Sequence, residues 1–212
     1  MKGGSRLPNL VRNRYSPYVD EIKIESGDKS SPIWLIINPN YPTVRQEVWI
    51  PILEIIQDRV YRKLHNRIGT EHIYIKSTVS DLGRVPSSNR EEISEGNKIL
   101  MESILRFQPK ILITFGSLTY ELINRLIDQR SEKGYQYWGS ADLELEFERS
   151  ILNFDVDQIN KIPLPRHLKK VGRNIEDHNY FVGENSEDYI QKAGTKIADR
   201  IIENKDYLNI WI

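Results

Sequence analysis

Two residues of the sequence, Asn38 and His167, are of types that could carry out hydrolytic chemistry. An asparagine side-chain carbonyl can hold and orient an attacking water, and a histidine imidazole can donate a hydrogen bond to an anionic leaving group. Each residue alone has a simpler interpretation, because asparagine commonly forms turns and a lone histidine commonly lies in a surface loop. Both, however, follow short apolar runs, and the hypothesis of a hydrolytic site depends on that shared position.

Basic side chains surround His167 and could bind phosphate groups. They are Arg166, Lys169, Lys170 and Arg173. Residues 161–175 carry no acid and neither do residues 1–18, whereas acids concentrate in residues 142–157. Because the formal net charge is zero, we expect one basic face on an otherwise balanced surface. For either basic stretch alone, a solvated loop is the simpler interpretation.

The pattern of apolar residues predicts strands that alternate with helices. Short apolar runs typical of buried strands occupy residues 33–37, 72–76, 110–115 and 160–164. Helical spacing and capping signals predict helices over residues 47–66, from a capping box at 88–91 to about 107, over 118–127, and from Ser186 onward. Residues 1–30 are predicted to be an N-terminal extension. The acidic segment 128–160 is predicted to be an insertion with one or two antiparallel strands.

This order of elements predicts a single α/β domain over residues 1–212. Its expected architecture is three-layer α/β/α, with a central, mainly parallel four-stranded sheet and right-handed crossovers. Ligands of such sheets bind beyond the carboxyl ends of the strands. That rule selects residues 38–42, 77–80, 115–117 and 165–173. Asn38 and His167 are therefore expected at the same edge of the sheet.

The composition excludes several kinds of chemistry. The chain has no cysteine, which excludes disulfides, thiolate nucleophiles, zinc–thiolate sites and iron–sulfur clusters. The four histidines show no ligand spacing, so no metal is expected. The phosphate-binding glycine loop and the G-x-S-x-G nucleophile turn are also missing. Without an apolar stretch of about eighteen residues or a signal peptide, we expect no membrane span and a cytoplasmic location.

Four segments, in this order, resemble the uracil-DNA glycosylase superfamily over residues 32–175. Ile37-Asn38-Pro39-Asn40 is similar to the Ile-Asn-Pro-Gly motif of the mismatch-specific branch. Tyr74-Ile75-Lys76-Ser77 stands where the superfamily has approximately Tyr-Ile-Thr-Asn. Residues 106–123, RFQPKILITFGSLTYELI, are similar to its segment Pro-x-x-Ile-x-x-x-Gly. Residues 163–174, PLPRHLKKVGRN, occupy the position of its last, histidine-bearing loop.

The resemblance implies a uracil-DNA glycosylase-like fold and a role for each matching residue. Asn38 would orient the water that attacks the sugar C1′, and His167 would stabilise the departing base anion once the nucleotide has been flipped into a pocket. The implied base-binding residues are Pro39, Tyr41, Trp49, Ser77 and Gly116, with core packing as the alternative for Trp49. The implied DNA contacts are Arg166, Leu168, Lys169, Lys170 and Arg173, of which residues 168–170 would press into the minor groove.

The expected function is a monomeric, monofunctional DNA glycosylase that acts on DNA without a metal, a cofactor or a covalent lysine intermediate. Ser77 stands where uracil-reading members carry an asparagine, and its smaller hydroxyl leaves more room for the base. Uracil, a damaged or mismatched pyrimidine and a modified pyrimidine of foreign (phage) DNA therefore all stay open, as do repair and antiviral defence. Two alternatives are a non-catalytic DNA- or protein-binding member of the fold, and a different α/β hydrolase or transferase acting on nucleotides.

Overall fold

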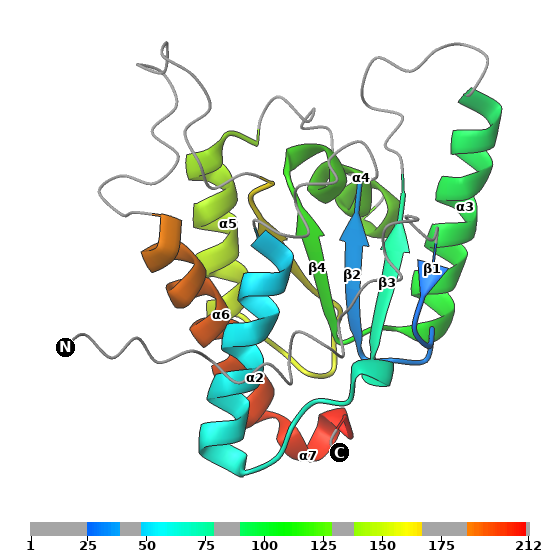
Figure 1. Ribbon diagram of the computed structural model, residues 1–212. Coiled ribbons are helices and arrows are strands. Elements are labelled where there is room, and N and C mark those ends of the chain that lie inside the picture. The colour runs from blue at the N-terminus through cyan, green and yellow to red at the C-terminus, as the bar shows by residue number, and fades with distance from the viewer. Residues whose placement is uncertain (1–24, 39–47, 79–89, 129–137, 167–185, 211–212) are drawn as a thin grey trace.

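A computed structural model describes residues 25–38, 48–78, 90–128, 138–166 and 186–210 (Figure 1). The strands are β1 (Glu25–Ser26), β2 (Ile33–Ile37), β3 (Ile73–Ser77), β4 (Ile111–Phe115) and β5 (Asn160–Leu164). The helices are α2 (Ile50–Leu64), α3 (Arg90–Phe107), α4 (Ser117–Asp128), α5 (Ser140–Leu152), α6 (Ser186–Glu203) and α7 (Lys205–Leu208), with a short 3₁₀ turn, η2 (Thr70–His72), before β3.

The strands form one sheet in the order β1-β3-β2-β4-β5. Strands β2, β3, β4 and β5 run parallel, and β1 pairs with the outer side of β3 in the antiparallel sense. Ile33 of β2 lies opposite Ile73 of β3 and Ile111 of β4. The four parallel strands therefore end together at one edge, which we call the carboxyl edge. The helices α2 to α6 each begin at this edge and run back across the sheet (Figure 1).

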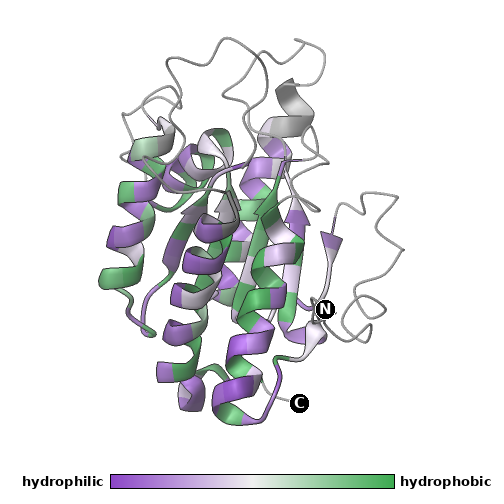
Figure 2. Cartoon of the chain, turned by 60° about the vertical axis from the view of Figure 1, so that its left-hand side comes forward, coloured by the Kyte–Doolittle hydropathy of each residue, from purple (hydrophilic) through white to green (hydrophobic). Residues whose placement is uncertain are grey.

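Helices cover both faces of the sheet, and each face has its own hydrophobic core. Side chains such as Leu35 and Ile113 pack with α2, α5 and α6 in the larger core. Trp34, Tyr74 and Leu112 point the other way and pack with α3 and α4 in the smaller core. Residues two apart on a strand face the same side, and Figure 2 shows the corresponding division of hydrophobic and hydrophilic residues along the helices.

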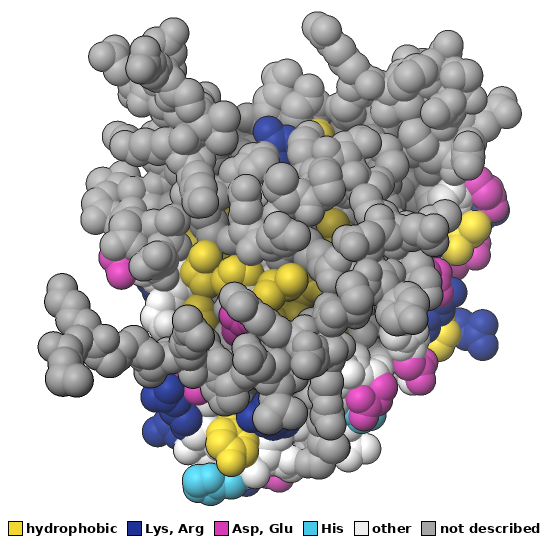
Figure 3. All heavy atoms as spheres, in the orientation of Figure 1, with side chains coloured by type: hydrophobic (Ala, Val, Ile, Leu, Met, Phe, Trp, Pro, Cys, Tyr) yellow, Lys and Arg dark blue, Asp and Glu magenta, His cyan; other side chains and the backbone are white. Residues whose placement is uncertain are grey.

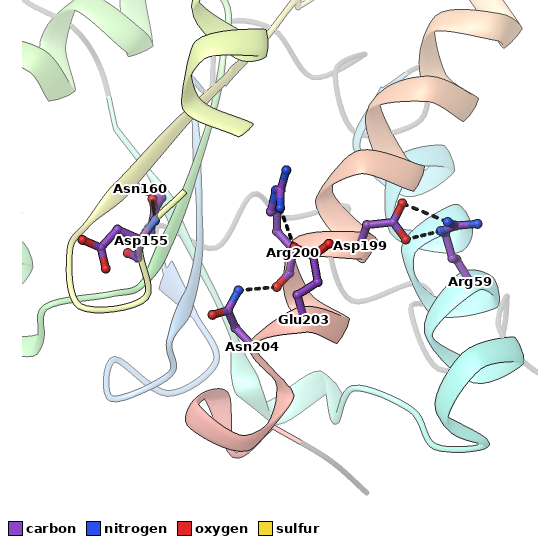
Figure 4. Close-up of polar contacts among 7 residues, drawn as sticks. All are labelled: Arg59, Asp155, Asn160, Asp199, Arg200, Glu203 and Asn204. Carbon is purple, nitrogen blue, oxygen red and sulfur yellow. Dashed lines mark hydrogen bonds and ion pairs between the residues drawn. The ribbon is translucent and has the colours of Figure 1, made fainter. Parts of the chain in front are cut away.

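Ion pairs join the helices of the larger core to one another. Arg59 of α2 donates two hydrogen bonds to Asp199 of α6, with Nε–Oδ1 at 2.6 Å and Nη2–Oδ2 at 2.9 Å (Figure 4). Lys192 of α6 lies 3.5 Å from Glu144 and 3.4 Å from Glu148 of α5, and Lys196 also pairs with Glu148. These acids of the segment 142–157 therefore form contacts between helices.

On the face seen in Figure 3, described hydrophobic side chains gather around the upper part of α2.

Most elements predicted from the sequence are confirmed. Strands 33–37 and 160–164 have the predicted bounds, the other two strands and the helices shift at their ends by up to three residues, and α6 begins at Ser186. The sheet has five strands instead of four, because β1 was missed. A strand of two residues shows no periodicity that could reveal it. β1 lies within residues 1–30, which the sequence pattern predicts to be an N-terminal extension.

The expectation of antiparallel strands in segment 128–160 was wrong for its described part, which forms α5. Leu143, Phe147 and Ile151 lie one helical turn apart and are all buried. Glutamates alternate with apolar residues through Leu143–Glu148, and this alternation imitates a strand. The helical repeat of the buried side chains decides the structure, because α5 packs against β5 and α6, with Phe147 and Ile151 in the larger core. Within the described residues, no helix has the length and apolarity needed to cross a membrane.

The position of α5 in the core predicts unequal effects for two substitutions in that helix. Phe147 is 1% exposed, so Phe147→Ala should lower the free energy of unfolding by about 3–5 kcal/mol through lost burial and a residual cavity. Leu145 is 51% exposed, and Leu145→Ala should change it by less than about 0.5 kcal/mol. Urea unfolding of both variants measures the difference, and equal effects would contradict the assignment of α5 to the core.

Candidate active site

Asn38 lies at the carboxyl end of the central strand β2 and is 4% exposed. The strand is bonded to β3 on one side and to β4 on the other. The Thr78 backbone N–H donates to the Ile37 carbonyl at 2.8 Å, so the pairing of β2 with the β3 chain continues past Ser77. The last register pairs are Ile37 with Ser77 and Ile36 with Thr114. Continued by one and by two residues, these registers bring Asn38 level with Thr78 and with Gly116. Asn38 thus lies between the ends of two neighbouring strands.

The face of the sheet under α3 becomes polar toward this edge. The inward side of α3 carries Leu100 and Ile104 in the smaller core, and one turn closer to the edge it carries Asn97, which is 6% exposed. The Thr78 hydroxyl donates to Asn97 Oδ1 at 3.4 Å. On the same face of β4, Thr114 follows the buried Leu112. We call Asn38, Thr78, Asn97 and Thr114 the polar layer.

Two hydroxyl groups near the strand ends have no hydrogen-bond partner within the described part of the chain. They are Thr114 Oγ1, in a residue that is fully buried, and Ser77 Oγ, whose oxygen is itself buried. A buried polar atom without a partner costs about 1–3 kcal/mol, so such atoms call for an explanation. Thr114 lies on the α3 and α4 side of the sheet, whereas Ser77 follows Ile75 on the α2 and α6 side. The structure does not bring these two hydroxyls together.

Gly116 forms the turn from β4 into α4 and supports the end of β5. Its φ is +86°, a conformation that side chains with a Cβ rarely adopt. Its N–H donates to the Leu164 carbonyl at 2.7 Å. A Cβ at this position would lie 3.2 Å from Arg166 Cβ. The aliphatic part of Arg166 therefore packs directly over the glycine, and this contact fixes where the chain leaves β5 toward residue 167.

A buried carboxylate holds the beginning of α5 beside α4. Glu121 is fully buried, accepts a hydrogen bond from Trp138 Nε1 at 2.7 Å, and pairs with Arg125 Nε at 3.0 Å. The Trp138 ring also meets the edge of the Tyr120 ring, with centroids 4.9 Å apart. Burial, together with nearby Glu146, raises the pKa of the Tyr120 phenol, which is therefore a neutral packing group. The contacts of Trp138 with Glu121 and Tyr120 fix the position of the start of α5 relative to α4.

Lys76 near the end of β3 already has an acidic partner. Its Nζ lies 3.1 Å from Glu25 Oε2 of β1, and Lys29 Nζ lies 2.8 Å from the other oxygen. Burial alone would raise the pKa of Glu25, but the hydrogen bonds from Lys29 and Lys76 hold it below its usual value. Lys76 therefore helps to hold β1 against β3.

The described residues include part of the site predicted from the sequence. Asn38, Ser77, Gly116 and Arg166 lie at or directly beyond the strand ends of the carboxyl edge. Trp49 precedes α2, is 4% exposed and packs in the larger core. Its role in base stacking stays a prediction. The predicted residues outside the described ranges are Pro39, Tyr41, His167, Leu168, Lys169, Lys170 and Arg173.

Sequence reasoning included Thr78 in the selected range 77–80 without giving it a role, and it missed Asn97 and Thr114. Asn97 had a detectable signal, because it stands three and seven residues before Leu100 and Ile104 and so extends the inward stripe of α3. A polar residue on such a stripe is unusual in a core. Thr78 and Thr114 had no comparable signal, since their importance depends on the register between strands.

In the described part of the chain, no three histidine, aspartate or glutamate side chains are grouped to hold a metal ion. A scan against protein-family models finds no match for the chain, and no curated protein matches its sequence.

The contact between Gly116 and Arg166 predicts opposite effects for two glycine substitutions. Gly116→Ala should lower the free energy of unfolding by at least about 1–2 kcal/mol, because the positive φ is strained for alanine and the new methyl group presses on Arg166. Gly96 lies on α3, and no atom comes within 4 Å of the position that a Cβ would take there. Gly96→Ala should therefore raise the free energy of unfolding by about 0.5–1 kcal/mol. Chemical denaturation measures both values. A Gly116→Ala variant with the free energy of unfolding of the wild type would contradict the turn described here.

The missing hydrogen bond of Thr114 predicts that its hydroxyl reduces stability. Thr114→Val keeps the shape of the side chain and removes the unpartnered oxygen, so it should raise the free energy of unfolding by about 1 kcal/mol and the Tm by about 2–4 °C. Thr78→Val removes a hydroxyl that does have a partner and should lower stability by about 1 kcal/mol. Calorimetry of the two variants tests this contrast. Destabilisation by Thr114→Val would show that its hydroxyl is satisfied.

Proposed function

We propose that the protein is a monofunctional DNA glycosylase that hydrolyses the N-glycosidic bond of a flipped uracil or of a modified or damaged pyrimidine. The observation that carries this proposal is the buried amide of Asn38 at the carboxyl end of the central strand. In the sequence it is followed by Pro39, as in the motif Ile-Asn-Pro that the chain shares with the mismatch-specific branch of the uracil-DNA glycosylase superfamily.

The chemistry of an amide decides how such a site works. The Asn38 side-chain carbonyl accepts a hydrogen bond from water but takes up no proton at neutral pH, so it orients the nucleophile without deprotonating it. The bond between C1′ and the base must therefore be largely broken before the water attacks. The base leaves with the bonding electrons, the water oxygen adds to C1′, and one water proton is released. The products are the free base and an abasic site.

The departing base is an anion and needs a hydrogen-bond donor. His167 follows Arg166 directly in the sequence, and Arg166 packs over Gly116, level with Asn38 in the strand register. The chain thus leaves the sheet at the same edge that carries Asn38. In the proposal, His167 donates a hydrogen bond to the base oxygen that gains the charge.

Charge at the carboxyl edge favours a polyanionic substrate. Helices α2 to α6 direct their amino-terminal ends to this edge (Figure 1), and these ends carry partial positive charge. In the proposal, Arg166, Lys169, Lys170 and Arg173 bind the phosphates around the flipped nucleotide, and Leu168 occupies the space that the base leaves in the duplex. Pro39, Tyr41, Ser77 and Gly116 line the base pocket, and the protein acts as a monomer on DNA.

The proposal leaves the biological role with two options. Ser77 carries an unpartnered hydroxyl among the described residues and leaves room for a substituted base. Repair of uracil or mismatched thymine is one option, and removal of modified pyrimidines from foreign DNA in antiviral defence is the other. The second candidate function, a non-catalytic DNA- or protein-binding protein, requires no water-holding amide.

A base-release assay tests the proposal. Duplexes with uracil, mismatched thymine, 5-hydroxymethyluracil or 5-hydroxymethylcytosine are incubated with the protein and then treated with alkali, which cleaves the strand at abasic sites. The wild type should release at least one base, and Asn38→Ala should lower the single-turnover rate by about 100-fold or more. Asn153→Ala, at an exposed asparagine that ends α5, is the matched control and should retain full activity.

Two results would contradict this function. Binding of every duplex without release of any base favours the non-catalytic alternative. Turnover of free nucleotides without action on DNA favours a different hydrolase or transferase.

A further inference from the structure

Strand β1 determines where the preceding part of the chain meets the sheet. It runs antiparallel to β3, with Glu25 opposite Lys76 and Ser26 opposite Ile75. Because β3 ends at Ser77, the first residue of β1 lies beside the carboxyl end of its partner. Residues 1–24, which lie outside the described ranges, are therefore attached to the structure at the carboxyl edge.

Backbone and charge contacts hold β1 in this position. Gly27 has a φ of +85°, and a Cβ there would lie 2.3 Å from the Ile73 carbonyl oxygen of β3. Glu25 pairs with Lys76 of β3 at 3.1 Å and with Lys29 at 2.8 Å. One carboxylate thus lies between two ammonium groups, so these contacts add no negative charge to the carboxyl edge.

The two acid-free basic stretches of the sequence are attached to opposite sides of the sheet. Residues 1–18, which we call the basic segment, precede β1, and residues 161–175 include β5 and the residues that follow it. The outermost strands are β1 and β5, and β2 lies between them in the centre. The chain enters β1 and leaves β5 at the carboxyl edge, so the two stretches are attached on either side of Asn38. The basic side chains of the basic segment are Lys2, Arg6, Arg12 and Arg14.

The length of the chain allows the basic segment to reach a substrate at Asn38. Two strand spacings of about 4.8 Å separate β1 from β2, so β1 begins about 10 Å to the side of the proposed site. Arg14 stands eleven residues before Glu25, and such a length of chain spans at most about 40 Å. A duplex with its flipped nucleotide at Asn38 therefore has phosphates within range of this arginine.

We infer that the basic segment is a second DNA-binding element, whose four basic side chains bind phosphates on the β1 side of the flipped nucleotide. This inference rests on the proposed glycosylase function. Residues 166–173 bind phosphates on the β5 side, so the duplex lies across the carboxyl edge from β5 to β1. Contacts of this kind add affinity that depends on salt, but they do not read the sequence of the DNA.

Neutralisation of the basic segment tests its contribution to binding. In one variant of the whole chain, glutamine replaces all four of its basic side chains. The Kd for a duplex with one 2′-fluoro-2′-deoxyuridine is measured by fluorescence anisotropy between about 50 and 200 mM salt. The Kd at low salt should rise at least about tenfold, and the slope of log K against log salt concentration should become shallower by at least about 1.

A matched control removes the same charge from the opposite edge of the sheet, where α2 ends and α7 lies (Figure 1). Glutamine replaces four exposed basic residues there, and this variant should keep the wild-type salt slope. The replaced residues are Arg62, Lys63, Arg67 and Lys205.

A second set of variants tests whether β1 positions the basic segment. Gly27→Ala leaves the charge unchanged but places a methyl group against the Ile73 carbonyl, which displaces β1 from β3. It should raise the Kd at least about threefold in the wild-type background through a lower effective concentration of the basic segment, and should have no effect in the neutralised variant. Gly96→Ala, where a Cβ meets no atom within 4 Å, is the control and should keep the wild-type Kd. Thermal unfolding verifies that the compared proteins are folded.

The outcomes distinguish this inference from the function on which it rests. If the wild type releases bases but the neutralised variant keeps the wild-type Kd and salt slope, the second DNA-binding element is refuted and the glycosylase function stands. An equal loss of affinity in the matched control would also refute it, because net charge alone would then explain the effect. If the wild type releases no base from any duplex, the function is refuted and the inference with it. A shallower salt slope in the neutralised variant alone supports the inference.

Discussion

The pairing of β2 with strands on both sides is the constraint on which the proposed site depends. A strand bonded to β3 and β4 and covered by helices on both faces cannot shift its register without exposing its buried side chains. The residue that follows it, Asn38, is thereby fixed beside Thr78 and level with Gly116. The turn at Gly116 and its contact with Arg166 then fix the end of β5 at the same edge. Catalysis by an oriented water needs such fixed positions.

The polar layer reduces the apolar packing of the fold at the carboxyl edge, where the proposed site lies. Along the interface between the sheet and α3, apolar side chains are replaced by Asn97, Thr78 and Thr114 toward the strand ends. Thr114 Oγ1 is buried there without a partner among the described residues, which is unfavourable for the free protein. At the opposite edge of the sheet, where the parallel strands begin, buried polar side chains form hydrogen bonds within the protein. There the Asn160 amide donates to the Lys110 and Asp155 carbonyls at 2.9 and 2.7 Å. The ion pair of Arg59 with Asp199 joins α2 to α6 (Figure 4).

The sequence predicted the α/β class, the four parallel strands and the position of Asn38, because buried parallel strands are continuous apolar runs. It missed β1, which is too short to show a pattern, and it misread α5, in which alternating glutamates hide a helical stripe of Leu143, Phe147 and Ile151. The Thr78–Asn97 pair could not be foreseen, since it depends on strand register and on the packing of α3. Sequence patterns report the burial of an element, whereas contacts between elements require the tertiary structure.

The central proposal is that Asn38, at the carboxyl end of β2, lies against a flipped nucleotide of DNA. Side-chain amide resonances in ¹⁵N–¹H correlation spectra test it most directly, on addition of a duplex that carries one 2′-fluoro-2′-deoxyuridine, whose fluorine slows cleavage of the glycosidic bond. The account predicts that the amide signals of Asn38 shift, that those of Asn153 and Asn160 stay in place, and that a duplex without the analogue has a much smaller effect. Unchanged Asn38 signals in a saturated complex would contradict it.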